Sequence, residues 1–179
     1  MVDVQKAILE RRSTRGFDDT PLTQEEIKTL LDAALSSPSV LNRQPWHFAF
    51  VTDKEAMAEI DEVMRELFTI EYGTKSEKRH FYNAPLFIAV TVDPAEKTRW
   101  THIECGIAVE NLALSAMGLG LGSVIITTPA MAFSSDKGGY FKRKMGIPMQ
   151  NEFVVGIVIG HSIVKGVPHK TREGRYNIV

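Results

Sequence analysis

Two short stretches near the ends of the sequence carry positive charge that nearby acidic residues do not balance. Residues 11–15 contain three arginines and a serine with no acid, and residues 161–179 contain four basic residues against Glu173 alone. If the two stretches meet, their guanidinium, ammonium and hydroxyl groups would suit a single phosphate group. The groups that could bind it are Arg11 or Arg12, Ser13, Lys170 and Arg172. The alternative is that both stretches are ordinary solvated surface.

A polar loop between the second predicted helix and the first predicted strand offers a different kind of chemistry. The segment SPSVLNRQPW at residues 37–46 places Ser39, Asn42 and Gln44 within a few positions of one another. Their hydroxyl and amide groups both donate and accept hydrogen bonds, so they suit the mixed edge of a heterocycle. The loop is therefore a candidate contact for a heterocyclic ligand.

Several other site motifs are excluded by their order or spacing. Three glycines, Gly118, Gly120 and Gly122, follow a predicted helix and open a strand, whereas a dinucleotide-binding loop follows a strand and opens a helix. The five histidines and Cys105 show no metal-ligand spacing, and we expect no metal site. Neither a G-x-S-x-G elbow nor a P-loop is present. We expect Cys105 to be a packing residue rather than a nucleophile.

Length and composition favour one globular domain over residues 1–179. The chain is 44% hydrophobic and 24% charged, with a net charge of −1. This charge argues against a nucleic-acid partner, and the basic tail lacks the interleaved aromatic residues that such a partner would need. The opening MVDVQKAILERRS lacks the apolar core of a signal peptide, and no apolar run approaches the roughly 20 residues that span a bilayer. We therefore expect a cytoplasmic protein without a membrane partner.

The hydrophobic pattern predicts alternating helices and strands. Apolar residues at helical spacing predict a helix over 4–11, and Arg11 lies at the end of its buried stripe, where it needs a partner. Thr23 and Glu26 form a capping box for a second helix, which should end just before Pro38. The other predicted elements are strand 46–51, helix 53–68, a mobile connection over 69–83 with a part-helical segment as its alternative, strand 84–92, a helix from Asp93 to Met117 closed by Gly118, strand 121–127, helix 137–145 and strand 152–160. Such alternation alone would suggest a parallel, doubly wound sheet.

The helix that ends near Met117 and the last residues of the chain both predict contact with a second subunit. Residues 103–116 leave almost no polar face, and a helix that is apolar all round must be covered on all sides. One small domain covers such a helix only in part, so we expect a homodimer. Residues 160–179 lack helical period and are too many for a frayed end. They predict an extended C-terminal arm that wraps over a partner.

Six segments, taken together, identify a family resemblance. In order they are RRSTRGF, SPSVLNRQPWHF, NAPLFIAVTVD, ECGIAVENLALSAMGLGLGSV, KMGIPMQNEFVVGIVIG and the KTR of the tail. Their joint order and spacing resemble the nitroreductase family of FMN-dependent oxidoreductases. The resemblance implies an α+β fold with three α/β/α layers and a mixed, largely antiparallel sheet, in place of the parallel sheet above. It also implies an intertwined homodimer that exchanges the C-terminal arm and holds two FMN sites at its interface.

The resemblance also assigns flavin contacts to individual positions. Arg11 would bind the phosphate, and Arg15 would lie near the N1 and C2-carbonyl edge of the flavin ring. The loop after the second helix would approach the flavin from the partner subunit, and the tail would add phosphate ligands. The implied cofactor-binding residues are Arg11, Arg12, Ser13, Arg15, Pro38, Ser39, Asn42, Gln44, Thr127, Thr128, Lys170 and Arg172.

The activity implied by the resemblance is the reduction of an electron-poor small molecule, such as a nitroaromatic or a quinone. NADH or NADPH would be the electron donor, FMN the cofactor, and the cycle ping-pong, with no side chain assigned as a catalytic acid or base. The alternative is a protein that stores or senses flavin with little turnover. The sequence departs from the family at residues 160–162, where Gly-His-Ser replaces the common Gly-Tyr-Pro, and it lacks a large insertion over the substrate site. The physiological acceptor is therefore left open.

Overall fold

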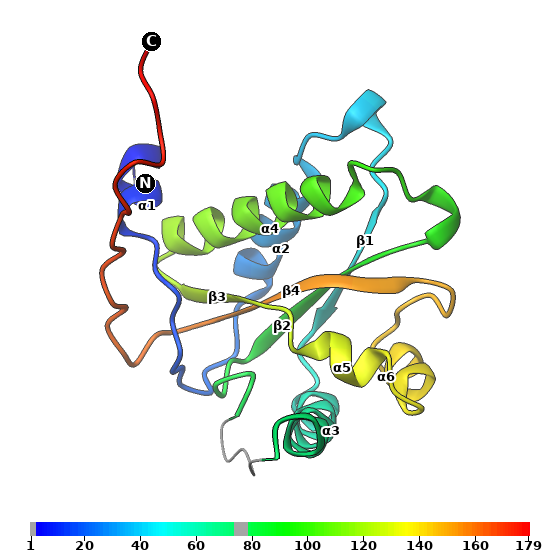
Figure 1. Cartoon of the computed structure of the whole chain (residues 1–179). Coiled ribbons are helices and arrows are strands. Elements are labelled where there is room, and N and C mark those ends of the chain that lie inside the picture. The colour runs from blue at the N-terminus through cyan, green and yellow to red at the C-terminus, as the bar shows by residue number, and fades with distance from the viewer. Residues whose placement is uncertain (1–2, 74–78) are drawn as a thin grey trace.

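The computed structural model describes residues 3–73 and 79–179, which form a four-stranded antiparallel sheet with helices on both faces (Figure 1). The strands, in the spatial order β1, β2, β4, β3, are β1 (Trp46–Val51), β2 (Leu86–Val92), β4 (Glu152–Gly160) and β3 (Gly122–Ile126). The helices are α1 (Val4–Glu10), α2 (Gln24–Leu35), α3 (Lys54–Tyr72), α4 (Thr101–Gly118), α5 (Pro129–Phe133) and α6 (Gly138–Lys144), with short 3-10 turns η1 (Val40–Asn42) and η2 (Pro94–Glu96).

Strand β2 lies at the centre of the sheet and is covered on both faces. Every residue of β2 is buried, and its side chains alternate between two cores. Phe87 and Ala89 enter the core beneath α3, α5 and α6, whereas Leu86 and Ile88 enter the core beneath α2 and α4. The continuous apolar run that predicts a strand at 84–92 is therefore explained by burial on both sides.

The parallel sheet suggested by helix and strand alternation is wrong. The β1–β2, β2–β4 and β3–β4 pairs are all antiparallel. Between described residues, the one parallel contact outside these strands is a single bridge from Ser13 to Ser123. Hydrophobic periodicity fixes which side chains enter a core, but it carries no information about strand direction. The three-layer α+β arrangement that the family resemblance implies is the one observed.

The predicted helix from Asp93 to Met117 is wrong over its first part. Asp93 caps only the turn η2, and Lys97 then adopts an extended backbone with φ −62° and ψ 135°. The chain turns again at Thr98, whose N–H donates to the Thr101 hydroxyl at 2.9 Å. Helix α4 begins at Thr101. The end differs too, because Gly118 is the last helical residue and the left-handed backbone that turns the chain lies at Gly120, with φ 77°.

Other boundaries were predicted with mixed success. The ends of strands 46–51 and 152–160 are confirmed. The capping box is also confirmed, because the Glu26 N–H donates to Thr23 Oγ1 at 3.2 Å and the Thr23 N–H donates to Glu26 Oε2 at 2.7 Å. Helix α3 continues to Tyr72, into the predicted connection over 69–83, of which residues 74–78 lie outside the described residues.

No helix within 3–73 and 79–179 is both long and apolar enough to cross a membrane.

Candidate functional site

The first basic stretch lies along the edge of the sheet. Helix α1 ends at Glu10, and the chain then runs extended, so that the Thr14 N–H donates to the Ser123 carbonyl at 2.9 Å. Thr14 packs so closely on Gly122 that a Cβ at that glycine would lie 2.8 Å from its side chain. The sheet edge therefore fixes the arginines on either side of Thr14.

The C-terminal arm runs beside this first stretch. The Asp18 N–H donates to the His161 carbonyl at 3.1 Å, and the Ile163 N–H donates to the Gly16 carbonyl at 3.2 Å. Farther along, a Cβ at Gly166 would lie only 2.3 Å from Arg12 Cβ. These contacts bring the two basic stretches of the sequence side by side, and beyond them the arm rises past α1 and projects away from the body (Figure 1).

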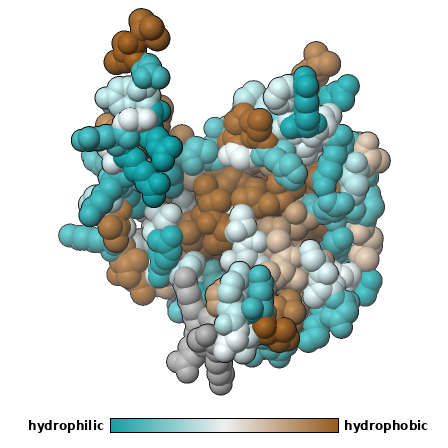
Figure 2. Space-filling model, viewed as in Figure 1, coloured by the Kyte–Doolittle hydropathy of each residue, from teal (hydrophilic) through white to brown (hydrophobic). Residues whose placement is uncertain are grey.

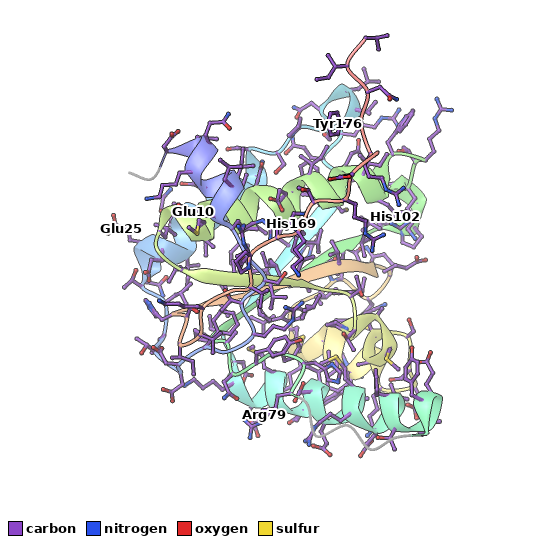
Figure 3. The ribbon with its side chains drawn as sticks, turned by 60° about the vertical axis from the view of Figure 1, so that its left-hand side comes forward. Glu10, Glu25, Arg79, His102, His169 and Tyr176 are labelled. Carbon is purple, nitrogen blue, oxygen red and sulfur yellow. The ribbon has the colours of Figure 1, made fainter. Side chains whose placement is uncertain are left out.

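A cavity of about 600 Å³ lies where the two stretches meet. Its lining contains three arginines and a lysine and no acidic residue, and it combines residues from α1, the segment after α1 and the arm. The lining residues are Ile8, Leu9, Arg11, Arg12, Ser13, Arg15, Val167, Pro168, His169, Lys170 and Thr171. Figure 3 shows His169 on the arm, on the same side of the sheet as α1 and α4. Five predicted cofactor-binding residues thus share one cavity, whereas Arg172 lies just beyond its last lining residue.

The arginines of this cavity have different amounts of free hydrogen-bonding capacity. Arg11 Nε donates to Glu110 Oε1 on α4 at 3.0 Å, which leaves its two terminal nitrogens available. Glu110 is thus the partner of Arg11 at the end of the α1 stripe, and the spacing of apolar residues along the sequence does not point to it. Arg12 Nη1 donates at 2.6 Å to the carbonyls of Leu9 and Arg11, so its side chain caps the end of α1.

Two other cations of the cavity have few partners of their own. Arg15 Nη1 makes one long contact, 3.4 Å, to the Ser13 carbonyl, and its side chain is exposed. Within the described part of the chain, Lys170 makes no side-chain hydrogen bond or ion pair. Arg11, Arg15 and Lys170 therefore offer donors that an anionic ligand would engage.

The predicted loop residues Pro38, Ser39, Asn42 and Gln44 lie elsewhere, beside the N-terminal half of α4. The Gln44 N–H donates to Ser39 Oγ at 2.9 Å, and Gln44 Nε2 donates to Asn42 Oδ1 at 2.9 Å. The Val40 N–H donates to Glu104 Oε1 on α4 at 2.8 Å. No residue of this loop lines the cationic cavity.

Thr127 and Thr128 form a third group at the end of β3. Thr127 is exposed, and its carbonyl accepts the Ala130 N–H at 3.0 Å in the first turn of α5. Ser123, at the other end of the strand, is the residue that contacts the basic stretch. One chain therefore does not gather the three predicted groups in one cavity.

A second cavity, of about 520 Å³, lies beside α3 on the other side of the sheet. Two of its basic lining residues have partners, because Lys54 Nζ lies 3.5 Å from Asp19 Oδ2 and Arg79 Nη1 donates to Asn83 Oδ1 at 2.8 Å. Figure 3 shows Arg79 near α3, far from His169 on the arm. Its lining sets three aspartates, Asp18, Asp19 and Asp61, against these two cations, so it is the weaker candidate for an anion site.

Cys105 lies in the core beneath α4 and does not reach either cavity. Burial raises the pKa of its thiol to about 12, and the carboxylate of Glu104 adds a smaller effect in the same direction. A buried, protonated thiol is unreactive. The geometry agrees with the expectation that Cys105 packs the core and does no chemistry.

The raised pKa of Cys105 predicts a loss of stability in alkaline solution. Above the ordinary thiol pKa of 9.0 the unfolded chain releases its proton while the folded chain keeps it, so the free energy of unfolding falls as pH rises from 9 towards 12. At about pH 10 the loss is on the order of 1 kcal/mol. Urea unfolding of the wild type and of Cys105→Ala at about pH 8 and about pH 10 measures it. An equal alkaline loss in Cys105→Ala would show that the thiol is not its source.

Comparison with known proteins matches residues 8–161 to the nitroreductase family. The chain is 37% identical over 126 residues to a protein of Methanothermobacter thermautotrophicus whose name proposes an NADH dehydrogenase or NAD(P)H nitroreductase, and this alignment covers 69% of the chain and 60% of that protein. It is 37% identical over 128 residues to a protein of the same name from Archaeoglobus fulgidus, covering 69% of the chain and 67% of that protein.

Solved structures agree over a longer span. A nitroreductase from Desulfitobacterium hafniense, crystallised with bound FMN, superposes over 100% of both chains with a TM-score of 0.88 and 28% identity. A Bacteroides fragilis nitroreductase with bound FMN superposes over 100% of both chains with a TM-score of 0.90. Because the two sequences are only 23% identical, this second match shows similarity of fold and nothing more.

Proposed function

The chain belongs to the nitroreductase family, and from this premise we propose that it is an FMN-dependent oxidoreductase that uses NADH or NADPH to reduce electron-poor acceptors such as nitroaromatics and quinones. The proposed cycle is ping-pong, with donor and acceptor using the same site in turn. We place this activity in the cytoplasm, where NADH and NADPH are made and consumed. The single observation that carries the proposal is the cationic cavity formed by the two ends of the chain.

The residues of this cavity fit the phosphate end of FMN. The terminal nitrogens of Arg11 and the ammonium of Lys170 supply charge-assisted donors, and Ser13 supplies a hydroxyl. The volume of about 600 Å³ lies within the range of roughly 300–1,000 Å³ that small-molecule sites occupy. When bound, FMN supplies the transfer of hydride equivalents, while the protein supplies binding, orientation and electrostatics.

Arg15 is proposed to set the electrostatics of the flavin ring. Among the described residues its exposed guanidinium makes one long contact, to the Ser13 carbonyl, which leaves other N–H groups to donate to the ring edge on which reduction places negative charge. Arg15→Ala is therefore expected to lower the midpoint potential of bound FMN. A shift on the order of 30 mV would correspond to about 1.4 kcal/mol for a two-electron couple. Anaerobic dye-equilibration titration measures the potential, and an unchanged value would remove Arg15 from this role.

A second subunit is proposed to complete the site. Helix α4 exposes Ile103 and Ile107, and β3 exposes Ile125. Figure 2 shows apolar side chains gathered in the region where Figure 1 draws α4 and β3. The C-terminal arm is exposed from Val167 to its end, Val179. A homodimer that covers this face with an exchanged arm would bring the 37–44 loop of one subunit towards the cavity of the other.

Flavin content and steady-state turnover test this function. The purified protein should carry visible flavin absorbance that is released as FMN. Under anaerobic conditions it should oxidise more NADH or NADPH than its bound FMN accepts only when menadione or nitrofurazone is added. A protein that stores or senses flavin would bind FMN and show no acceptor-dependent rate. Bound FMN without such a rate would therefore favour that alternative over the proposed enzyme.

A further inference from the structure

Helix α4 presents two polar side chains to the loop between α2 and β1. Glu104 is only 5% exposed, and its Oε1 accepts the Val40 N–H at 2.8 Å. Asn111 Nδ2 donates to Ser37 Oγ at 2.9 Å. The two residues are seven positions apart, which is about two helical turns, so both face the same way. They form a pair of contacts along one side of α4.

These two polar contacts lie next to an apolar part of α4. The neighbouring buried side of α4 consists of apolar residues such as Cys105, Ala108 and Leu112, which pack into the core beneath α2 and α4. A buried carboxylate is costly unless it is hydrogen-bonded, and an apolar residue would fill the same space without that cost. Packing alone therefore does not explain Glu104, whereas the fixed position of the loop does.

The loop itself is held in an unfavourable backbone conformation. Leu41, Asn42 and Gln44 all have positive φ, at 54°, 55° and 48°. Such values are uncommon outside glycine, and they persist only where surrounding contacts enforce them. The contacts of Gln44 with Ser39 and Asn42 set the shape of the loop, but they are local.

Among the described residues, α4 alone ties this shape to the rest of the fold by side-chain hydrogen bonds. Within 3–73 and 79–179, the side-chain hydrogen bonds that reach residues 37–44 from a distant part of the chain are those of Glu104 and Asn111. Leu41, at the tip, is 83% exposed. The loop is therefore fixed at its base and presented to the outside.

We propose that Glu104 and Asn111 are positioning residues that hold the 37–44 loop in the conformation in which it contacts FMN bound by a partner subunit. This inference rests on the proposed function. Ile107 lies three positions after Glu104 and four before Asn111, so this exposed residue is next to them on the helix surface, and the exposed Ile103 lies beyond it. Helix α4 would thus place the loop and the subunit interface relative to each other.

The decisive test compares Glu104→Ala with Glu104→Gln in the full chain. Glu104→Ala removes the acceptor and should weaken FMN binding roughly tenfold, whereas glutamine keeps an acceptor oxygen and should hold the dissociation constant within about threefold. Hydrogen exchange of the Val40 amide, measured without FMN, should be faster in Glu104→Ala and close to wild type in Glu104→Gln. Ser37→Ala removes the Asn111 contact together with a long bond, 3.5 Å, from Ser37 Oγ to the Ala33 carbonyl, and it gives a milder second variant if Glu104→Ala does not fold.

Asn151→Ala is the matched control for a general loss of stability. It removes a buried hydrogen bond, from Asn151 Nδ2 to Thr91 Oγ1 at 3.0 Å, that touches neither α4 nor the loop. This control should be destabilised and bind FMN as the wild type does. Wild-type FMN affinity and Val40 exchange in Glu104→Ala and Ser37→Ala would overturn the positioning role while leaving the proposed function intact. A wild-type protein that binds no FMN would overturn both.

Discussion

Arg11→Ala is expected to raise the dissociation constant for FMN by roughly 10- to 150-fold. A hydrogen bond to a charged group contributes about 1.5–3 kcal/mol, and the two terminal nitrogens of Arg11 are the donors that we propose for the phosphate. Glu110 holds Arg11 Nε at 3.0 Å and thereby fixes the direction of these nitrogens. Fluorescence titration of the apoprotein with FMN measures the change.

Two comparisons make the Arg11 result interpretable. Lys28→Ala removes a charge on the exposed surface of α2, where Lys28 pairs with Asp32, and it should leave FMN affinity unchanged. Losing the part-exposed Arg11–Glu110 pair should change the free energy of unfolding by no more than about 1 kcal/mol. An Arg11→Ala protein that is equally stable and binds FMN like the wild type would contradict the assignment of the cavity.

Ile107→Asp is expected to convert the protein to a monomer and to abolish tight FMN binding. Ile107 lies in the exposed apolar part of α4 that we propose as the centre of the subunit interface, and burying an unpaired carboxylate there costs several kcal/mol. In the monomer the residue is 38% exposed, so the substitution should leave the fold itself intact. Light scattering after size exclusion measures the oligomeric state, circular dichroism measures the fold, and fluorescence titration with FMN measures the binding.

Met149→Asp is the control for the Ile107 substitution. Met149 is also an exposed apolar residue, 48% exposed, but it lies between α6 and β4, away from α4. It should leave both the oligomeric state and FMN binding as in the wild type. A dimeric Ile107→Asp protein would place the subunit interface elsewhere, and a monomer with full FMN affinity would show that one chain completes the site.

The fold was predictable from the sequence where local patterns determine it. The capping box of Thr23 and Glu26 marks the start of α2, and the apolar run of β2 reflects burial on both faces. Strand direction was not predictable from these patterns, because alternation of side chains is the same in parallel and antiparallel strands. The start of α4 was missed because Asp93 and Pro94 form a good helix start that Lys97 then interrupts.

The candidate site was predictable in part. Unbalanced charge identified both basic stretches, but it could not separate Arg11 from Arg12, because their difference depends on how the chain leaves α1. The acids of α4 were missed as a group. Glu104 and Glu110 interrupt an otherwise apolar helix. A carboxylate among buried residues needs a hydrogen-bond partner, so its presence in such a helix indicates a specific contact.

The most direct test of the central claim is an anaerobic experiment that separates the two halves of the cycle. NADH or NADPH, added to the purified protein without acceptor, should bleach the visible absorbance of one bound FMN per chain. After the nicotinamide is removed, menadione or nitrofurazone should restore that absorbance in full. A protein whose bound flavin is not bleached by either nicotinamide, or whose bleached flavin is not reoxidised by any such acceptor, would contradict the proposed oxidoreductase.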